Sequence, residues 1–429
     1  MKIKMIFPRW NRLLEGQDVL HEGDPGYYIS SYKMAGLGLP TVASLTPSNI
    51  DLELIDDFFE PIDFDDSADL VAITAFTPQA IRAYQIADEF RMRKVPVVIG
   101  GKHPTILPEE AVHHADYVIL GEAEYTWPQF ISDFQEGKAS SMYKAQDYYD
   151  KDIWTIPKRE LVNKKGYNMD IALLQTIKGC YMRCEGCTLP ATEGTHFRYK
   201  PFEIMLEEIN SIRNHIIYLV DDTLLSGMHE LGYIPRFLDF LAPLGKKYIF
   251  NSTPQFLMRH QKYIPNFVKA GLQTTYLIMG MHSIITPMEI RKREYKYEVE
   301  IYDFIQQLRD HGIAVFLTVF LGFDHQGPKI FEEVIQFAKK MEVECCEFTL
   351  ATPFPGTPFY ERLKHEGRLL HTDWKKYNCG NVVFHPKNLT PKELMDGYLF
   401  CWKEFYRDVD KNKLNLFEIN NIGKRFIEG

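Results

Sequence analysis

Three cysteines, Cys180, Cys184 and Cys187, stand close together in the segment KGCYMRCEGC at residues 178–187. No fourth cysteine lies near them in the sequence. Iron–sulfur clusters are normally held by four cysteine thiolates, so a loop with three thiolates would leave one iron open to another molecule. The segment therefore predicts an iron–sulfur cluster with an open iron, held by these three cysteines.

A structural zinc ion is the alternative metal for the same thiolates. Structural zinc takes four closed ligands, commonly from two closely spaced pairs of Cys or His. The neighbouring sequence offers a lone His196 as the fourth ligand. The spacing therefore favours the cluster, and zinc stays open as the alternative.

The length and composition indicate an enzyme with more than one domain. The chain has 429 residues, of which 45% are hydrophobic and 14% aromatic, which is enough for two or three packed domains. The formal net charge of −9 argues against a nucleic acid as the main partner, because a polyanion is bound by a basic surface.

The seven cysteines show no disulfide-like framework, which indicates a reducing compartment. The first residues contain a short apolar run that ends before Arg9. This run is too short for a signal peptide or a spanning helix. We therefore expect a cytoplasmic protein without a transmembrane segment.

Residues 1–140 alternate short apolar runs with helical patterns, and Ala80–Arg93 has the period of a crossover helix. Continuous runs of Val, Ile and Leu are typical of parallel strands buried on both faces. The pattern predicts an α/β Rossmann-like domain. Its predicted strands are Ile3–Pro8, Asp51–Asp56, Leu70–Ala75, Pro96–Gly101 and Tyr117–Glu122.

Ligands of such sheets bind beyond the carboxyl ends of the strands. We therefore expect a cofactor at the loops that follow three of these strands, where glycines permit close approach of the backbone. The histidine of the second loop has two interpretations: it lines the ligand site, or it caps a helix predicted at Pro104–Ala111. The candidate residues are Thr74, Thr77, Gly100, Gly101, His103, Gly121 and Glu122.

Residues 141–168 are polar and predict a linker, and residues 169–360 contain six further apolar runs separated by helical patterns. Repeated βα units favour right-handed parallel winding, so we expect a partial (β/α)6 barrel with its chemistry at the carboxyl ends of the strands. Residues 361–429 predict a small helical C-terminal region. The predicted barrel strands are Ile171–Ile177, Ile216–Asp222, Lys247–Thr253, Thr274–Met281, Ala314–Phe323 and Cys346–Pro353.

The spacing of the three cysteines, directly after a predicted strand, resembles that of the radical S-adenosylmethionine enzymes. In that family the open iron of a four-iron, four-sulfur (4Fe-4S) cluster chelates S-adenosylmethionine and cleaves it reductively to a 5′-deoxyadenosyl radical. The first domain resembles the cobalamin-binding domain of one large subclass of the family. The segments that carry this second resemblance are Gly36–Pro40, Leu54–Asp57, Gly100–Glu110 and Gly121–Glu124.

The resemblance implies roles for residues at the ends of the barrel strands. Asp221 and Asp222 follow the second strand, where the family binds the amino group of S-adenosylmethionine; a helix cap is the alternative for one of them. Asn251 and Ser252 would bind the ribose or the carboxylate. Gly280 would let the backbone approach the cofactor.

The sequence departs from the family pattern at several places. The Asp-x-His-x-x-Gly motif that supplies a lower cobalt ligand in other cobalamin proteins is absent, as it commonly is in this subclass. The lower ligand is therefore open between His103 and the residues of Thr74–Gln79. Gly186 stands where an aromatic residue usually precedes the third cysteine, and His282 stands where the family often has glutamate.

The resemblance predicts a cobalamin-dependent C-methyltransferase for an unactivated carbon, with hydrogen abstraction by the 5′-deoxyadenosyl radical and methyl transfer from methylcobalamin. A flavodoxin or ferredoxin would supply electrons. The substrate class stays open among a peptide or protein, a tetrapyrrole, a lipid and a natural product. The alternatives are a non-methylating radical oxidation, cyclisation or rearrangement, and a non-catalytic metal-binding assembly factor.

The mechanism imposes one condition on the arrangement of the domains. A methyl group can reach a substrate radical only if the corrin and the open iron face a shared cavity. We therefore expect the loops Thr74–Gln79, Gly100–Thr105 and Gly121–Glu124 to lie opposite Cys180–Cys187, because pockets of this kind form at domain interfaces.

Overall fold

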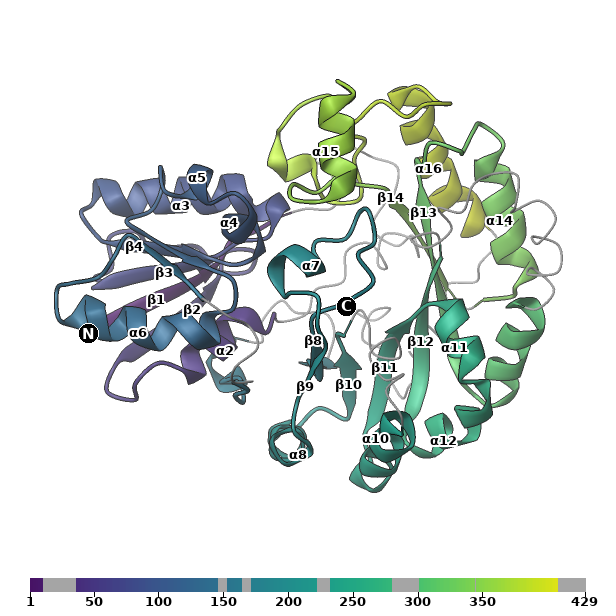
Figure 1. Ribbon diagram of the computed structural model, residues 1–429, viewed down its shortest axis with the longest axis horizontal. Coiled ribbons are helices and arrows are strands. Elements are labelled where there is room, and N and C mark those ends of the chain that lie inside the picture. Colours follow the sequence, from purple (N-terminus) through teal and green to yellow (C-terminus); the bar gives the residue numbers. More distant parts are fainter. Residues whose placement is uncertain are drawn as a thin grey trace.

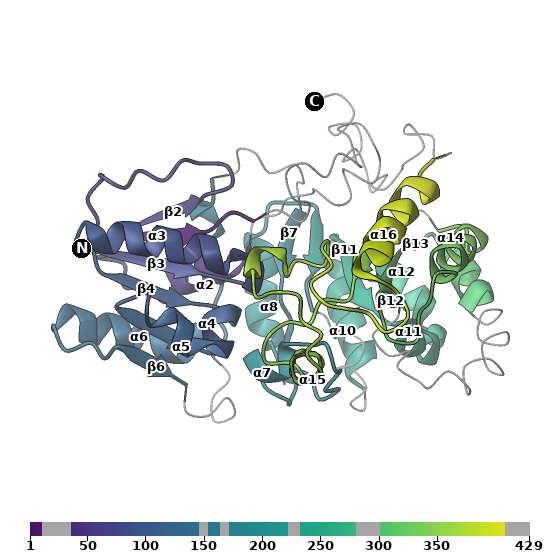
Figure 2. The ribbon, with the colours of Figure 1, turned by 90° about the horizontal axis from the view of Figure 1, so that it is seen from above.

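The computed structural model describes residues 1–10, 36–145, 153–163, 171–221, 232–279, 301–343 and 345–407. These residues form two α/β bodies, one around an N-terminal sheet and a larger one around a curved sheet (Figure 1). The two bodies lie side by side in the view from above as well (Figure 2).

The first sheet has the strand order β2-β1-β3-β4-β5-β6, and all neighbours are parallel. Its strands are apolar and buried on both faces, as in the run LVAIT of β3. The five predicted strands are confirmed to within two residues at their ends. The strands are β1 (Lys2–Phe7), β2 (Asp51–Asp56), β3 (Leu70–Thr74), β4 (Val97–Gly100), β5 (Tyr117–Leu120) and β6 (Met142–Lys144).

Helices cover both faces of this sheet (Figure 1). The buried face of α3 (Ala80–Met92) packs in one apolar cluster with alternate strand residues such as Val71 and Ile73. The intervening residues, among them Leu70 and Ala72, pack on the other face with α2 (Gly38–Ser44) and α6 (Ala123–Gln135). This alternation follows from the period of two of a strand.

Two details differ from the sequence-based expectation. The predicted linker begins inside the first sheet, because Met142–Lys144 pair in parallel with β5 as strand β6. The helix predicted at Pro104–Ala111 is divided into α4 (Lys102–Ile106) and α5 (Pro108–Ala111). Leu107 separates them with φ −123° and ψ 63°, because a residue that precedes proline is disfavoured in the helical region.

The second sheet has the order β14-β13-β12-β11-β10-β7, again with parallel neighbours. Its curved strands and outer helices form the open barrel of Figure 1, so the predicted α/β fold with a partial barrel is confirmed. The strands are β7 (Ile171–Leu174), β10 (Ile216–Leu219), β11 (Lys247–Ser252), β12 (Leu272–Met279), β13 (Ala314–Leu321) and β14 (Cys345–Leu350). The outer helices include α8 (Phe202–Ser211), α10 (Tyr233–Leu241), α11 (Pro254–Arg259), α12 (Ile264–Lys269) and α14 (Ile330–Lys340).

The first predicted barrel strand, Ile171–Ile177, ends earlier than expected. Strand β7 stops at Leu174, and β8 (Ile177–Lys178) pairs in antiparallel fashion with β9 (Arg198–Tyr199). The backbone N–H groups of Thr176 and Ile177 donate instead to the carboxylate of Asp221, at 2.7 and 2.9 Å. These bonds take the two residues out of the main sheet.

The C-terminal region contains α15 (Pro358–His365), η5 (Trp374–Lys376) and α16 (Pro391–Phe405). Helix α16 packs on β14 and α14 through Cys401 and Trp402, and Leu394 near its start lies beside Gly322, which follows β13. Residues 408–429 of the predicted helical tail lie outside the described residues. The first sheet extends past the predicted boundary at 140 to Lys144, and the domain boundaries at 168 and 360 stay predictions.

Ala351, Phe359 and Trp374 of the C-terminal half belong to the same apolar cluster as the first sheet and α3. One apolar cluster therefore spans the first sheet and the C-terminal segment, while the barrel strands pack in a separate cluster. No helix of the described residues is long and apolar enough to cross a membrane.

Candidate active site at the domain interface

The cysteine loop lies between β8 and α7 (Leu189–Thr192). Gly179 begins it with φ +77°, and a Cβ atom there would lie 2.0 Å from the carbonyl oxygen of His196. The backbone N–H of Cys180 donates to Gly194 O at 3.1 Å. On its other side the loop is tied to α15, because Arg362 Nε donates to Glu185 Oε1 at 2.7 Å. The loop is thus fixed at both ends.

The three cysteines of this loop are the candidate ligands of the predicted cluster. Cys180 is buried, Cys184 and Cys187 are half-buried, and burial raises the pKa of the Cys184 thiol. Among the described residues, no three Cys, His, Asp or Glu side chains converge as ligands of one metal ion. In a four-iron cluster each thiolate binds a different iron, so the three sulfur atoms lie farther apart than they would around one ion. Its soft thiolate ligands are those the loop supplies.

Asp221 lies at the end of β10, and its carboxylate points at the segment that leads into the cysteine loop. It accepts hydrogen bonds from the Thr176 and Ile177 N–H groups and from Thr176 Oγ1, the last at 2.6 Å. Burial raises the pKa of Asp221 to about 7, against the lowering effect of these donors. Asp221 therefore holds the approach to the cluster. Asp222 lies outside the described residues.

Asn251 and Ser252 end β11 and, as neighbours in a strand, point to opposite faces. The Asn251 side chain lies beside Tyr218, whose hydroxyl donates to Asn251 Oδ1 at 2.8 Å. Ser252 donates to the carbonyl of Thr253 at 3.2 Å. Asn251 and Ser252 therefore cannot both contact the same ligand on one face of the sheet. Gly280 and His282 lie outside the described residues.

A cavity of about 230 Å³ opens at the carboxyl ends of β3, β4 and β5, where the first body meets the second. Gly101 has φ +105°, and a Cβ atom there would lie 2.8 Å from Ala75 N and from Thr74 Oγ1. Glycine at this position thus lets two strand-end loops meet. Of the predicted cofactor-binding residues, Thr74, Gly100, Gly101, Gly121 and Glu122 line the cavity, together with Lys178 and Glu193 from the second body.

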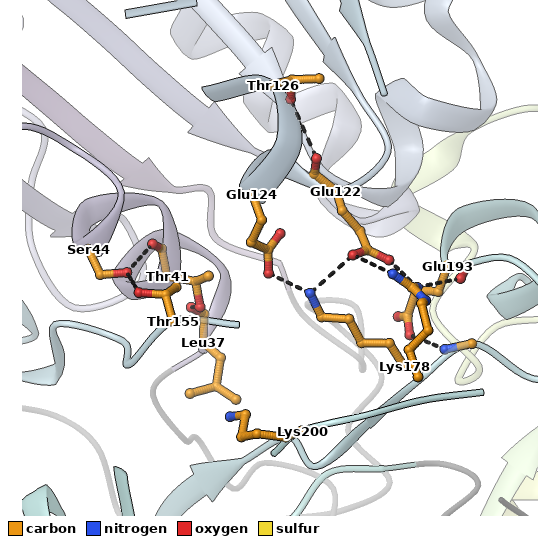
Figure 3. Close-up of polar contacts among 12 residues, drawn as sticks. Leu37, Thr41, Ser44, Glu122, Glu124, Thr126, Thr155, Lys178, Glu193 and Lys200 are labelled. Atoms are coloured by element: carbon orange, nitrogen blue, oxygen red, sulfur yellow. Dashed lines mark hydrogen bonds and ion pairs between the residues drawn. The ribbon is translucent and has the colours of Figure 1, made fainter. Parts of the chain in front are cut away.

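Buried ion pairs close the side of the cavity that faces the cysteine loop. The Lys178 ammonium group lies between Glu124 Oε1 at 2.6 Å and Glu122 Oε2 at 3.1 Å (Figure 3). Arg198 binds both oxygens of Glu122, with Nη1 at 2.9 Å from Oε2. Lys178 and Arg198 were not singled out in the sequence analysis. The position of Lys178, two residues before Cys180, is the signal that could have identified it.

The structure places Thr77 and His103 away from the residues that line the cavity. The His103 ring is fully buried, with Nδ1 3.4 Å from Thr77 Oγ1 and Nε2 3.4 Å from Glu110 Oε1. Trp374 of η5 donates to the same carboxylate at 2.9 Å. His103 does not cap α4, because it lies inside this helix, and the N-cap position is Gly101, without a side-chain hydrogen bond.

The strand-end loops of the first body face the cysteine loop, as the mechanism requires. The Gly100–Gly101 loop shares the cavity with Lys178, and α4 contacts α7 at the end of the cysteine loop. Of the segment Thr74–Gln79, Thr74 lines the cavity. The side chain of Gln79 turns instead to the Pro8 carbonyl, at 2.6 Å.

Comparisons with known proteins match this arrangement. The B12 binding domain family matches residues 32–131, and a domain family of unknown function matches residues 357–411. Bacteriochlorophyllide d C-12(1)-methyltransferase of Chlorobaculum tepidum is 30% identical over 387 residues, which cover 86% of this chain and 82% of that protein. The C-8(2)-methyltransferase of the same organism is 27% identical over 394 residues, 86% of each chain.

Among solved structures, the radical S-adenosylmethionine methyltransferase TsrM from Kitasatospora setae matches with a TM-score of 0.64 at 14% identity. The match covers 85% of this chain and 76% of that one, and it shows the shared fold. The match to the B12 binding domain supports the predicted cobalamin site, and the two methyltransferase relatives bear out the predicted methyltransferase activity. The chain belongs to the cobalamin-binding radical S-adenosylmethionine methyltransferase family.

Proposed function

We propose that this protein methylates an unactivated carbon of a tetrapyrrole-type substrate. The observation that carries the proposal is the shared interface, where the cavity of the first body and the cysteine loop lie on either side of Lys178. The substrate class is supported by the two relatives from Chlorobaculum tepidum, which are bacteriochlorophyllide methyltransferases.

We assign the cluster to residues of the second body and cobalamin to residues of the first. Cys180, Cys184 and Cys187 hold the 4Fe-4S cluster, and Asp221 fixes the segment that precedes it. Thr74, Gly100, Gly101 and Gly121 form the cavity wall for the nucleotide tail of cobalamin. When bound, these cofactors and S-adenosylmethionine supply a 5′-deoxyadenosyl radical and a transferable methyl group.

The remaining partners follow from the same chemistry. The cluster takes its electron from a reduced flavodoxin or ferredoxin. No nucleic acid is required, which agrees with the net charge of −9. We place the protein in the cytoplasm, where the thiolates stay reduced before cluster assembly.

The test begins with anaerobic reconstitution of the protein with iron, sulfide and cobalamin. The product should show the absorbance of cluster and corrin. When given bacteriochlorophyllide and a reductant such as reduced flavodoxin, it should convert S-adenosylmethionine to 5′-deoxyadenosine and S-adenosylhomocysteine. Formation of 5′-deoxyadenosine without S-adenosylhomocysteine would favour the non-methylating alternative. Binding of one zinc ion and no iron would favour the assembly factor.

Two cysteine variants, one inside the loop and one outside it, test the assignment of the cluster ligands. Cys184→Ala should abolish the cluster colour and S-adenosylmethionine cleavage together, since two thiolates cannot hold what three hold. Cys379→Ala, outside the loop, should keep both. An active Cys184→Ala protein without a cluster would refute the assignment.

A further inference from the structure

The inference concerns the C-terminal segment at residues 357–411, which matches a domain family of unknown function. It rests on the proposed function, because it requires the iron–sulfur cluster. We propose that this segment is a clamp on the cysteine loop, in which Phe359 and Arg362 of α15 are positioning residues. They hold the stretch between Cys184 and Cys187 in place for the cluster.

The first contact uses the start of helix α15. The first N–H groups of a helix have no acceptor within the helix. Here Pro358 has no N–H group, and the Tyr360 N–H donates to Thr357 Oγ1 at 3.2 Å. The Phe359 N–H donates instead to the carbonyl oxygen of Glu185, at 3.0 Å. The start of α15 is thereby bonded to the backbone between the second and third cysteines of the loop.

The ring of Phe359 packs on the same stretch of the loop. A Cβ atom at Gly186 would lie 4.0 Å from Cδ1 of this ring, which is an ordinary van der Waals distance. Phe359 is 6% exposed and meets Phe384 edge-to-face, with the ring centres 5.5 Å apart. A side chain at position 186 that is much larger than a methyl group would therefore compete with a buried ring for space.

Arg362 makes the side-chain contact, one turn further along α15. Its Nε donates to Glu185 Oε1 at 2.7 Å, and its Nη1 donates to Asp324 Oδ2 at 2.8 Å. Asp324 follows β13 at the carboxyl end of the barrel, and Arg368 Nη2 donates to its other oxygen at 2.5 Å. The side chains of Arg362, Glu185 and Asp324 are 24–33% exposed. Half-buried charges thus join the loop through α15 to the end of a barrel strand.

These contacts affect the cluster in two ways. Partners that orient the ligands of a metal change its affinity about 10–100-fold, and both contacts to Glu185 act on the residue next to Cys184. The reduction potential of an iron–sulfur cluster also depends on the charge around it. Without Arg362, the Glu185 carboxylate would lose its positive partner, and uncompensated negative charge disfavours the addition of an electron. The clamp therefore holds the cluster and raises its reduction potential.

The test compares Arg362→Met with Lys364→Met, which removes an exposed positive charge from the same helix. The whole protein with a reconstituted cluster is titrated with an iron chelator. Its reduction potential is measured by an anaerobic titration followed by electron paramagnetic resonance. Arg362→Met should lose half of its cluster at about tenfold less chelator than the wild type, and its potential should be lower. Lys364→Met should match the wild type in both, and equal behaviour of the two variants would overturn the inference.

Two further comparisons keep the test decisive if Arg362→Met does not fold. Arg362→Lys keeps the charge but lacks the planar fork that binds both carboxylates, so it should keep the reduction potential and lose part of the resistance to chelator. Gly186→Ala should match the wild type, whereas Gly186→Leu should displace the Phe359 ring and lose the cluster at less chelator.

A Gly186→Leu protein that retains its cluster as firmly as Gly186→Ala would contradict the role of Phe359. A wild-type protein that binds no cluster would refute the proposed function as well. A cluster that forms but is insensitive to all of these variants would refute this inference alone.

Discussion

The first body meets the rest of the chain through two interfaces of opposite character. Next to the cysteine loop the contact consists of buried ion pairs from Glu122 and Glu124 to Lys178 and Arg198. At the C-terminal segment the contact is an apolar core that includes Tyr360 and Trp374, and the Trp374 indole N–H also donates to the Glu110 carboxylate.

The two interfaces differ in whether they mainly stabilise the contact between the bodies or fix their orientation. Apolar burial contributes free energy in proportion to area but has little direction. Buried ion pairs gain little net free energy after desolvation, yet they are costly to break and fix the groups that form them. The apolar interface therefore joins the two bodies, and the charged one sets the position of β8 and the cysteine loop against the cavity.

The largest expected effect is that of Glu122→Ala. This change removes the carboxylate shared by Lys178 and Arg198; Lys178 keeps Glu124, but Arg198 loses its buried ion pair, so the free energy of unfolding should fall by about 3–5 kcal/mol. Denaturant unfolding measures the loss. Glu109→Ala, an exposed acid of the same body, should change it by less than about 0.5 kcal/mol. If Glu122→Ala and Glu109→Ala lower the free energy of unfolding equally, the ion pairs of Glu122 do not fix the interface as proposed.

The apolar interface is tested by Trp374→Phe. Phenylalanine keeps most of the packing but cannot donate to Glu110 Oε2, so the variant should lose about 1.5–3 kcal/mol, the contribution of a hydrogen bond to a charged group. Trp374→Ala, which also opens the core, should lose more. If the two variants unfold alike, the packing of the indole contributes nothing and the apolar assignment of this interface is wrong.

Some parts of this architecture could be predicted from the sequence because their signals are local. The buried strands appear as apolar runs, and the three cysteines lie in one loop. The ion pair between Glu122 and Arg198 joins residues 76 positions apart, and no local pattern reports such a pairing. The direction of the His103 side chain likewise depends on Glu110 and Trp374, and Trp374 lies in a distant part of the chain.

The role of Asp221 could be predicted only in part. Its place after a strand indicated a carboxylate at the carboxyl end of the barrel strands, and the structure places Asp221 there. Its partners, the N–H groups of Thr176 and Ile177, became available because β7 ends at Leu174. The apolar run Ile171–Ile177 gave no sign of that break.

The pH dependence of stability sharpens the comparison, because Asp221 is a buried acid that accepts hydrogen bonds from Thr176 and Ile177. Its pKa is raised from 3.8 to about 7 in the folded protein. The folded state therefore holds a proton that the unfolded state releases, and this contribution to stability falls as the pH rises from about 4 to about 7, by at most about 1.4 kcal/mol per pH unit.

Asp221→Asn should remove this part of the pH slope, as measured by denaturant unfolding at several pH values. Asp303→Asn, an exposed acid on an outer helix, should keep the wild-type slope. An Asp221→Asn protein whose stability falls between pH 4 and pH 7 as steeply as the wild type would show that Asp221 is ionised throughout.

The smallest effect is expected when an ion pair is removed as a whole. In the double variant Lys178→Met/Glu124→Gln both charges of one pair disappear, Glu122 keeps Arg198 as its partner, and the methionine can pack on Trp154, whose ring lies 4.8 Å from Lys178 Nζ. Replacement of a buried pair by uncharged groups is often nearly neutral, so the free energy of unfolding of the double variant should lie within about 1 kcal/mol of the wild type.

Lys178→Met alone should be less stable than the double variant, because it leaves Glu124 charged and largely buried. The double variant could instead lose as much free energy of unfolding as the two single variants together. The ion pair would then contribute to stability as well as to orientation, and the two interfaces would not differ in the way proposed.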